Sequence, residues 1–504
     1  MRPADSIRNP GPFFFLRKVN VPLTKTKKCV AAAVLSSTLP KQARASKEAG
    51  TMRLAVIGAG IVGLTTGAGF AELGHQVDCY DVDAGKIKQL MRGRVPYYEP
   101  DLEALVARNV EAGRLRFGCN PERLPLEADV IFMAVGTPSA ADGQLRLSYL
   151  WEAADRIGEW PDGNARIVVI KSTVPVGTAE RLESRLRSRL PAHCPVHVAS
   201  VPEFMREGHA VRDFFEPSRI VIGAANPEAA SRLEQLHGAL SGPVVHMDRR
   251  SAELAKLASN AALAVKLSFA NEIAALAEQT GADYPAIARA MGLDPRIGPH
   301  FLGAGLGFGG SCLPKDARGL VRLADEAGAP QTLVSAAIRA NALLPLRMVR
   351  KLEAALSDLP RRKVALLGLA FKPGTDDLRE APSLRLAAEL LRRHPGITLT
   401  AYDPAAGRMA KRLLPGAVRL CDSAEEALHG TDAAIIATDW PEFRQIPANV
   451  FKKRMKRAII LDGRNLLDAA ALNAQGVVCI GTGRLPGAAS ESCGVETDRS
   501  SLLS

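Results

Sequence analysis

A glycine-rich stretch that leads into one cysteine holds the residues best suited to chemistry. Residues 303–310 contain five glycines, and Cys312, Lys315 and Asp316 follow directly after them. Glycine lets a backbone come close to a bound ligand. A thiol beside a cation such as Lys315 is expected to have a lowered pKa and to act as a nucleophile. The alternative is a glycine-rich loop around a buried, inert cysteine, because free cysteine is among the most buried residue types.

A second motif points to a dinucleotide. Gly58-Ala-Gly60-Ile61-Val62-Gly63 follows a strand pattern at Arg53–Ile57 and precedes an apolar helical pattern that runs to about Leu73. Gly58 permits a tight turn, Gly60 lets a pyrophosphate approach, and Gly63 allows close packing of helix on strand. The N-terminus of the helix presents free N–H groups to a phosphate. The alternative is a Rossmann fold that binds no nucleotide.

An acidic residue at the end of the next strand pattern bears on the choice of cofactor. That pattern, Gln76–Tyr80, is followed directly by Asp81. A carboxylate at this position binds the ribose hydroxyls and repels the 2′-phosphate of NADP. The sequence therefore predicts NAD as the cofactor.

Further buried strand patterns carry polar motifs at their carboxyl ends, where open parallel sheets bind ligands. The strands are predicted at Val130–Val135, Arg166–Ile170, Val196–Ser200 and Arg219–Ile222; the first three precede Gly136-Thr137-Pro138, Lys171–Thr178 and Pro202–Gly208. Glu203 and Glu207 would share one side of the last motif if it were helical. Read alone, both are as well explained as solvated loop acids.

A long helix is predicted in the middle of the chain, from Ser251 to about Gln279. The stretch contains no glycine or proline, and its apolar character on all sides predicts burial. Lys256 and Asn260 are four residues apart, so they share one face and suggest the wall of a polar site. The alternative for Lys256 is a side chain that extends to water. Helices continue to about Leu344, and long apolar helices of this kind predict a dimer interface.

A second α/β pattern begins after Arg361. Strands are predicted at Val364–Leu367, Thr398–Tyr402, Ala433–Ala437, Ala458–Asp462 and Val477–Ile480. Lys372 and Arg464 each follow a strand, which suits a phosphate, although surface charge would explain them equally. Arg296, in Asp294–Gly298, could grip an oxygen-rich ligand or be an exposed loop residue. The predicted fold is α/β, with two Rossmann-like parallel-sheet domains joined by a long-helix central helical domain.

Composition and charge argue against several classes of partner. The net charge is +12, but the first 51 residues hold ten Lys and Arg against two acids. The rest of the chain therefore has nearly equal numbers of positive and negative residues, which does not indicate a nucleic-acid-binding face. No apolar run reaches the roughly 18 residues of a membrane span, so no membrane partner is expected. The eight cysteines form no CxxC pair, which argues against a metal site and favours a reducing, cytoplasmic location.

These patterns divide the chain into five parts: a leader (1–51), an NAD-binding Rossmann domain (52–245), a central helical dimerisation domain (246–345), an α/β domain for the second ligand (346–483) and a disordered tail (484–504). The leader loosely resembles a secretion signal. We favour instead a start at Met52, one residue before the first strand pattern.

Between residues 52 and 483 the chain resembles the UDP-glucose/GDP-mannose dehydrogenase family. The resemblance rests on seven motifs in the family's order: Gly58–Gly63, Val135–Pro138, Lys171–Thr178, Pro202–Gly208, Asp294–Gly298, Gly307–Asp316 and Gly368–Arg379. Ser311 before Cys312 fits the UDP-glucose and GDP-mannose branches, since the UDP-N-acetylmannosamine branch has histidine there. Asp294–Gly298 favours UDP-glucose. Val201 departs from the family's usual asparagine, which puts the local loop geometry in question.

The resemblance implies specific roles. The implied catalytic residues are Cys312, Lys256, Asn260, Asp316, Glu203 and Thr137. The implied NAD contacts are Gly58, Gly60, Ile61, Val62, Gly63, Asp81, Lys86, Thr137, Glu207 and Arg379. UDP-glucose contacts are implied for Glu203, Phe204, Met205, Lys256, Asn260, Arg296, Phe301, Leu302, Gly303, Gly309, Lys372 and Arg464. Arg296 is expected to reach the sugar in a neighbouring subunit, which requires a homodimer.

The activity implied by the resemblance is a four-electron oxidation of UDP-glucose to UDP-glucuronate for polysaccharide synthesis, with two NAD and one water. Cys312 would form a thiohemiacetal and then a thioester. Two alternatives stay open: GDP-mannose 6-dehydrogenase, which shares the chemistry, and a catalytically silent protein that binds a nucleotide sugar.

Overall fold

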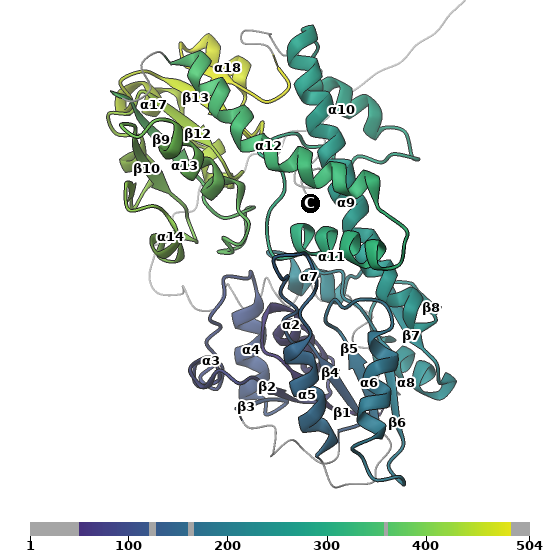
Figure 1. Ribbon diagram of the computed structural model, residues 1–504. Helices are drawn as coiled ribbons and strands as arrows, with labels where there is room; N and C mark the ends of the chain where they lie inside the picture. Colours follow the sequence, from purple (N-terminus) through teal and green to yellow (C-terminus); the bar gives the residue numbers. More distant parts are fainter. Residues whose placement is uncertain (1–49, 120–127, 160–165, 357–360, 485–504) are drawn as a thin grey trace, which may run out of the picture. The chain divides into compact units, whose positions relative to one another are not determined.

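The computed structural model describes residues 50–119, 128–159, 166–356 and 361–484. The predictions for the leader up to residue 49 and for the tail from residue 485 lie outside these residues. The described chain contains two sheets and a group of long helices between them in sequence (Figure 1). The predicted fold class is therefore confirmed.

The first sheet has eight strands in the order β3-β2-β1-β4-β5-β6-β7-β8. Its strands are β1 (Arg53–Ile57), β2 (Gln76–Tyr80), β3 (Leu115–Gly118), β4 (Val130–Met133), β5 (Arg166–Ile170), β6 (Val196–Ser200), β7 (Ile220–Ala224) and β8 (Val244–Met247). All neighbours are parallel except β6 and β7. The first six strands have the order of a dinucleotide-binding sheet. In such a sheet the strand order switches between β1 and β4: strands added before the switch extend the sheet to one side of β1 and later strands extend it to the other.

Alternate residues of β1 enter two different hydrophobic cores, because successive side chains of a strand point to opposite faces. Leu54 and Val56 belong to one core, and Ala55 and Ile57 to the other. The helices of this half are α2 (Ile61–Glu72), α3 (Ala84–Leu90), α4 (Leu102–Glu111), α5 (Ser148–Gly158), α6 (Thr178–Arg187), α7 (Ala210–Phe215) and α8 (Pro227–His237). Both faces of the sheet are thus covered, as a parallel sheet requires.

The strand predictions in this half hold to within two residues, but β3 and β8 were not predicted. Both are short, with four residues each, and β8 is not fully buried. Short strands of this kind lack the long apolar run that marked the others. The pairing of β6 with β7 is antiparallel, so the sheet is mixed at that end.

A 32-residue helix, α9 (Arg249–Thr280), dominates the middle of the chain. It begins at the N-cap Asp248, whose side chain accepts the N–H of Ser251, and ends at Gly281, which has a positive φ of 79°. Leu254, Phe269 and Leu276 on this helix are 43–57% exposed. The prediction that α9 is buried on all sides is therefore wrong for the single chain. Most of the buried positions of this helix hold alanine or polar residues, whereas these three large apolar side chains are exposed.

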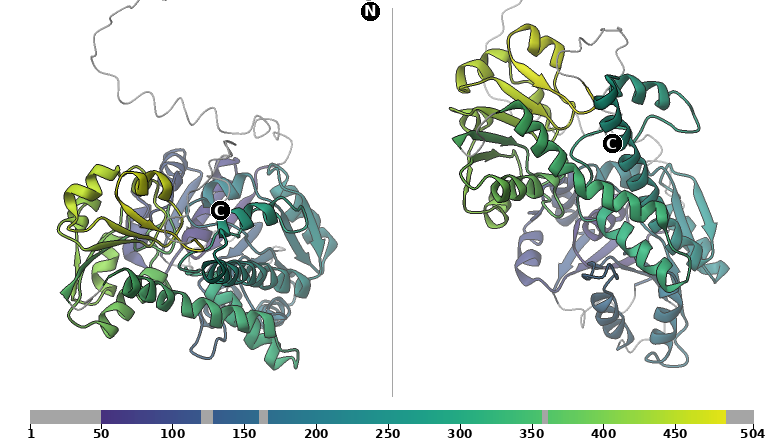
Figure 2. Two further views of the ribbon diagram at one scale, coloured as in Figure 1. Left: turned by 90° about the horizontal axis from the view of Figure 1, so that it is seen from above. Right: turned by 45° about the horizontal axis from the view of Figure 1, so that its top comes forward.

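Three further helices pack with α9: α10 (Tyr284–Gly292), α11 (Leu313–Glu326) and α12 (Thr332–Ala355). In Figure 2 the green α12 lies against the teal α9. Within the described ranges, α12 is the one helix long and apolar enough to cross a membrane by length and composition. Its buried face packs against α9, α11 and α13 (Pro382–Arg393), as that of a core helix does.

The second sheet has six parallel strands in the order β11-β10-β9-β12-β13-β14. They are β9 (Lys363–Leu367), β10 (Thr398–Tyr402), β11 (Val418–Leu420), β12 (Ala433–Ile436), β13 (Ile459–Asp462) and β14 (Val478–Ile480). Its helices are α13 (Pro382–Arg393), α14 (Gly407–Leu413), α15 (Ala424–Leu428), α16 (Pro441–Arg444), α17 (Ala448–Arg454) and α18 (Ala469–Ala474). The three-residue β11 was the strand not predicted here.

Candidate active site

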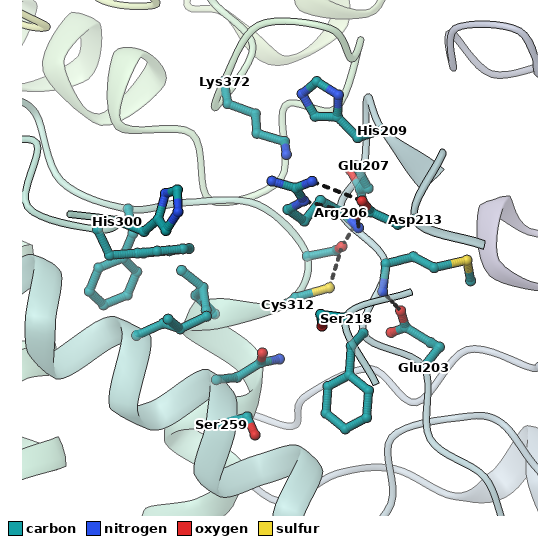
Figure 3. A pocket seen from close by; sticks show the side chains of 18 of the residues that line it. Glu203, Arg206, Glu207, His209, Asp213, Ser218, Ser259, His300, Cys312 and Lys372 are labelled. Atoms are coloured by element: carbon teal, nitrogen blue, oxygen red, sulfur yellow. Dashed lines mark hydrogen bonds and ion pairs between the residues drawn. The ribbon is translucent and has the colours of Figure 1, made fainter. Parts of the chain in front are cut away.

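A cavity of about 740 Å³ brings together residues that are far apart in the sequence. Its walls come from the loop after β6, from α9, from the glycine-rich stretch before α11, and from the loops after β9 and β13. Figure 3 shows Glu203, Glu207, Cys312 and Lys372 around this space. The carboxyl ends of both sheets thus contribute, as expected for open α/β sheets.

The glycine-rich stretch needs its glycines mainly because other parts of the chain come close. A Cβ on Gly307, where φ is +91°, would lie 2.2 Å from Oδ1 of Asn341. Asn341, on α12, holds both backbone groups of Phe308, accepting its N–H and donating to its carbonyl, each at 2.9 Å. The prediction that these glycines allow close approach of a ligand is therefore incomplete, because Gly307 also allows the loop to pack against Asn341 on α12.

Cys312 caps the N-terminus of α11 and lines the cavity. Burial raises the pKa of its thiol to about 11; the Lys256 ammonium opposes this rise, while the carboxylates of Glu203, Asp316 and Glu207 add to it. The predicted lowering of the pKa by Lys315 is therefore wrong. The Nζ of Lys315 donates instead to Oδ1 of Asp316 at 2.5 Å, so that cation is already neutralised.

Lys256 and Asn260 lie on the same face of α9, as their spacing predicts. The Nζ of Lys256 donates to Oε1 of Glu203 at 3.1 Å, and Nδ2 of Asn260 donates to Oδ2 of Asp316 at 2.6 Å. Burial by itself would lower the pKa of Lys256, but Glu203, Cys312 and Asp316 outweigh it and raise the pKa. Lys256 therefore remains a cation although its side chain is buried.

Glu203 and Glu207 point to different partners because the loop between β6 and α7 is not helical. Oε2 of Glu203 accepts the N–H of Met205 at 2.7 Å. Oε1 of Glu207 accepts the Ser311 hydroxyl at 2.7 Å and lies 3.5 Å from Arg379. Burial raises the pKa of Glu207 to about 7, Asp377 adds to the rise, and Ser311 and Arg379 oppose it.

The fingerprint residues at the β1–α2 turn fit a dinucleotide. Gly58 has a φ of +102°, and a Cβ on Gly63 would lie 1.9 Å from the carbonyl oxygen of Gly58. A Cβ on Gly60 would meet nothing within 4 Å, and no side chain caps α2 there. Because no side chain caps α2, its first N–H groups, from Ile61 on, are available to a phosphate.

The acid at the end of β2 is held in place. Asp81 Oδ2 accepts the N–H of Ala59 at 2.9 Å and the ammonium of Lys86 at 2.8 Å. Burial acts to raise the pKa of Asp81, but the hydrogen bonds from Lys86, Asp83 and Ala59 outweigh it and lower the pKa. An ionised Asp81 next to the fingerprint supports NAD, and Lys86 is tied to that carboxylate.

Several predicted contacts with the second ligand line the cavity: Phe204, Met205, Phe301, Gly303, Gly309, Lys372 and Arg464. Burial lowers the pKa of Lys372, which Glu207 opposes. The three guanidinium nitrogens of Arg464 donate to the carbonyls of Ala437, Gly307 and Phe371 at 2.9–3.3 Å. Arg464 thus joins the loop before α11 to the second sheet.

Four predicted catalytic or substrate-binding residues do not line the cavity in the described chain: Thr137, Leu302, Arg296 and the fully buried Asp316. Thr137 is 7% exposed and its hydroxyl donates to the carbonyl of Thr173 at 2.7 Å. Leu302 is 3% exposed and its carbonyl accepts the Tyr284 hydroxyl at 2.7 Å. The Arg296 side chain is 88% exposed and pairs with Asp294. Thr137 and Leu302 therefore make hydrogen bonds within the chain around the cavity, whereas Arg296, although paired with Asp294, is exposed at the surface.

Sequence reasoning missed three residues that shape the cavity. Lys171 lines it, and burial lowers the pKa of this lysine to about 8 although Glu203 opposes the shift. The guanidinium of Arg219 lies 3.6 Å from the ring centre of Phe204. Ser311 touches both Cys312 and Glu207. Lys171 and Ser311 lie inside motifs that the sequence analysis had recognised, so their position in those motifs could have identified them as site residues. No feature of the sequence marked Arg219 as one.

Three domains of one family match the chain in order. The NAD binding domain of the UDP-glucose/GDP-mannose dehydrogenase family matches residues 52–241, its central domain residues 250–343, and its UDP binding domain residues 365–469. A UDP-glucose 6-dehydrogenase of Bacillus subtilis is 43% identical over 433 residues, with 86% of this chain and 98% of the relative covered. One of Pseudomonas aeruginosa is 44% identical over 449 residues, with the same coverage.

Solved structures agree. A UDP-glucose dehydrogenase from the archaeon Pyrobaculum islandicum superimposes with a TM-score of 0.80 at 39% identity, covering 86% of this chain and 98% of the other. A UDP-D-ManNAc dehydrogenase from Pyrococcus horikoshii gives 0.75 at 31% identity, covering 86% and 99%. The chain therefore belongs to the UDP-glucose/GDP-mannose dehydrogenase family, and it is an NAD-dependent oxidoreductase with a UDP-binding domain.

Proposed function

We propose that the protein is a UDP-glucose 6-dehydrogenase that oxidises UDP-glucose to UDP-glucuronate with two NAD and one water. The names of its relatives support UDP-glucose as the substrate. The observation that carries the proposal is that the Cys312 thiol shares one cavity with the cation of Lys256, with Asn260 and with Lys372. Oxidation of an alcohol to an aldehyde needs no nucleophile, whereas in an oxidation to the acid a thiol can add to the aldehyde and supply the tetrahedral carbon for the second hydride transfer.

In the first oxidation, the C6 hydroxyl loses its proton through a water held by Lys256, Asn260 and Asp316. The residues around Gly58–Gly63, with Asp81, Lys86, Glu207 and Arg379, would hold NAD, which would supply the hydride acceptor for each oxidation. The Lys256 cation stabilises the negative charge that develops on the oxygen, and burial strengthens this effect. The product is an aldehyde.

In the second oxidation, the Cys312 sulfur adds to the aldehyde and forms a thiohemiacetal. This step restores a tetrahedral carbon with a C–H bond, which a second hydride transfer needs. The resulting thioester is hydrolysed by water, with Glu203 as the base. Thr137 assists Glu203: its hydroxyl donates to the carbonyl of Thr173, and its oxygen can still accept a hydrogen bond.

For the substrate, we assign Lys372 to the pyrophosphate and Phe204, Met205, Phe301, Gly303 and Gly309 to the walls around the sugar. Arg464 supports that end through its carbonyl contacts. The division into an NAD-binding part (52–245), a central part (246–345) and a UDP-sugar part (346–483) belongs to the same proposal. So do a cytoplasmic location and a role in supplying UDP-glucuronate for polysaccharide synthesis.

We also propose a homodimer built on α9. The exposed side chains of Leu254, Phe269 and Leu276 lie on this helix, and exposed apolar side chains of this size need cover. In such a dimer the exposed Arg296 reaches the sugar bound by the neighbouring subunit. Light scattering gives the test: the purified chain should have twice the monomer mass, and Leu276→Lys should yield monomers.

The decisive experiment counts NADH per UDP-glucose consumed. A yield of two establishes the double oxidation, whereas a yield of one or none contradicts the proposal. Cys312→Ser should form no UDP-glucuronate, and retained product formation would refute the role of the thiol. Replacing UDP-glucose by GDP-mannose separates the two nucleotide sugars, since faster turnover of GDP-mannose would favour the alternative activity.

A further inference from the structure

A three-residue chain of polar atoms leads away from the nucleophile. The Sγ of Cys312 lies 3.5 Å from the Ser311 hydroxyl, and that hydroxyl donates to Oε1 of Glu207 at 2.7 Å. Figure 3 shows the two contacts as dashed lines that join Cys312 to Glu207 through one oxygen. A hydroxyl between a thiol and a carboxylate can accept a proton from one and donate its own to the other.

The thiol needs such a route because its surroundings do not ionise it. Burial raises its pKa to about 11, and three carboxylates add to the effect. Lys256 already pairs with Glu203, and Asp316 is occupied by Asn260 and Lys315. Among the described residues, neither Glu203 nor Asp316 hydrogen-bonds to the sulfur, whereas the Ser311 hydroxyl lies 3.5 Å from it.

Glu207 is suited to receive the proton. Its Oε2 is buried and accepts no hydrogen bond from a described group. Asp377, Arg379 and Lys372 are the charged groups that act on it, and burial with the Asp377 carboxylate brings its pKa to about 7. A base that titrates near neutral pH is ionised often enough to accept a proton and basic enough to hold it.

We propose that Ser311 relays the thiol proton of Cys312 to Glu207 while the sulfur adds to the aldehyde. The inference rests on the proposed function. The S–H bond breaks as the C–S bond forms, the Ser311 proton moves to Glu207, and the carbonyl electron pair becomes an oxyanion beside Lys256. That oxyanion reforms a carbonyl when the hydride leaves. Hydrolysis later expels the thiolate, which regains the proton from Glu207 through Ser311, so atoms and electrons balance.

The test separates the two oxidations. The rate of the first oxidation is the rate of NADH formation from UDP-glucose when semicarbazide traps the aldehyde. The rate of the second oxidation is the rate of NADH formation in a single turnover of the 6-aldehyde of UDP-glucose, before the thioester is hydrolysed. The ratio of the second rate to the first does not depend on the folded fraction. Ser311→Ala should lower this ratio about a hundredfold, and Ser311→Thr, which keeps the hydroxyl, should restore it.

Two further variants make the test decisive. Ser311→Gly removes the same hydroxyl in a stretch already rich in glycine, and should lower the ratio as Ser311→Ala does. The double variant Ser311→Ala with Glu207→Gln should have the same ratio of second to first rate as Ser311→Ala alone, because both residues act in one proton path. An unchanged ratio in either truncation, or independent losses in the double variant, overturns the relay. A wild-type protein that forms no NADH from UDP-glucose overturns the proposed function, and the relay with it, before any variant is made.

Discussion

The Nζ atom of Lys256 lies 3.1 Å from Oε1 of Glu203, and the two side chains are only 5% and 8% exposed. The Lys256 side chain on α9 is nearly buried, so its charge is balanced inside the cavity by Glu203 from the loop after β6. This pair connects the central helices to the first sheet at the point where the chemistry is proposed.

Breaking this pair should cost both stability and activity. Lys256→Met leaves the Glu203 carboxylate buried without its partner, which we expect to lower the free energy of unfolding by about 3–5 kcal/mol. NADH formation from UDP-glucose should fall at least about a hundredfold, since the oxyanion loses its cation. Denaturant unfolding and an absorbance assay measure the two effects.

Two variants serve as references for that prediction. Lys88→Met removes an exposed lysine on α3 and should change neither quantity. Lys256→Met combined with Glu203→Gln should recover part of the stability but none of the activity. A single Lys256→Met variant as stable and active as the wild type would contradict the role of the pair.

The reactivity of Cys312 should follow its raised pKa. Iodoacetamide attacks thiolate, and with a thiol pKa of about 11 the rate of alkylation should still rise about tenfold per pH unit between pH 8 and pH 10. Asp316→Asn removes a carboxylate that raises this pKa, so the profile should move to lower pH. Lys256→Met removes the cation that lowers it, so the profile should move to higher pH.

Mass spectrometry of the Cys312 peptide gives these rates, and the exposed Cys119 reports reagent consumption in the same sample. An alkylation rate that levels off below pH 9, or a shift of either variant in the opposite direction, would show that the charges around the thiol act otherwise than the structure indicates.

Two glycines of the fingerprint should respond differently to alanine. Gly63→Ala would place a Cβ 1.9 Å from the Gly58 carbonyl oxygen, so the turn must distort and the melting temperature should fall. Gly60→Ala would meet nothing within 4 Å, so stability should stay close to that of the wild type. The methyl group would, however, fill space proposed for the pyrophosphate, and KM for NAD should rise. Equal stability losses in both variants would argue against this assignment.

Asp81 should set the preference for NAD. Asp81→Asn removes the charge that repels a 2′-phosphate and weakens the hold on Lys86, whose ammonium lies 2.8 Å from Oδ2. The ratio of kcat/KM for NADP to that for NAD should rise roughly tenfold or more. Asp78→Asn, on the same strand but paired with Arg116, should leave the ratio unchanged. If both variants behave alike, the preference lies elsewhere.

Much of the fold could be predicted from local sequence. Strands β1, β2, β5, β6 and β10 begin and end where their apolar runs do, and the long helix α9 lies within two residues of its expected ends. These elements are long or fully buried, so their composition alone marks them. Strands β3, β8 and β11 escaped prediction because each is short and its apolar run is interrupted by a polar residue, namely Arg116, His246 or Arg419. The neighbouring strand supplies their hydrogen bonds.

The candidate site was predicted as a set of residues but not as an arrangement. Lys315 stands three positions from Cys312 in sequence, yet its ammonium is taken by Asp316, and the cation that acts on the thiol is Lys256. Glu203 and Glu207 looked like a pair because four residues separate them. The loop is not helical, so one joins Lys256 and the other joins Ser311.

The sequence by itself determined the family and the cofactor and predicted the reacting thiol, because glycine turns, strand–helix alternation and motif order are read directly along the chain. Only the tertiary structure decided which charges meet. Lys256 and Glu203 are 53 residues apart, and Asn260 and Asp316 are 56 apart. Contacts over such separations depend on how helices and sheets pack, and packing sets the burial and the partners that fix each pKa.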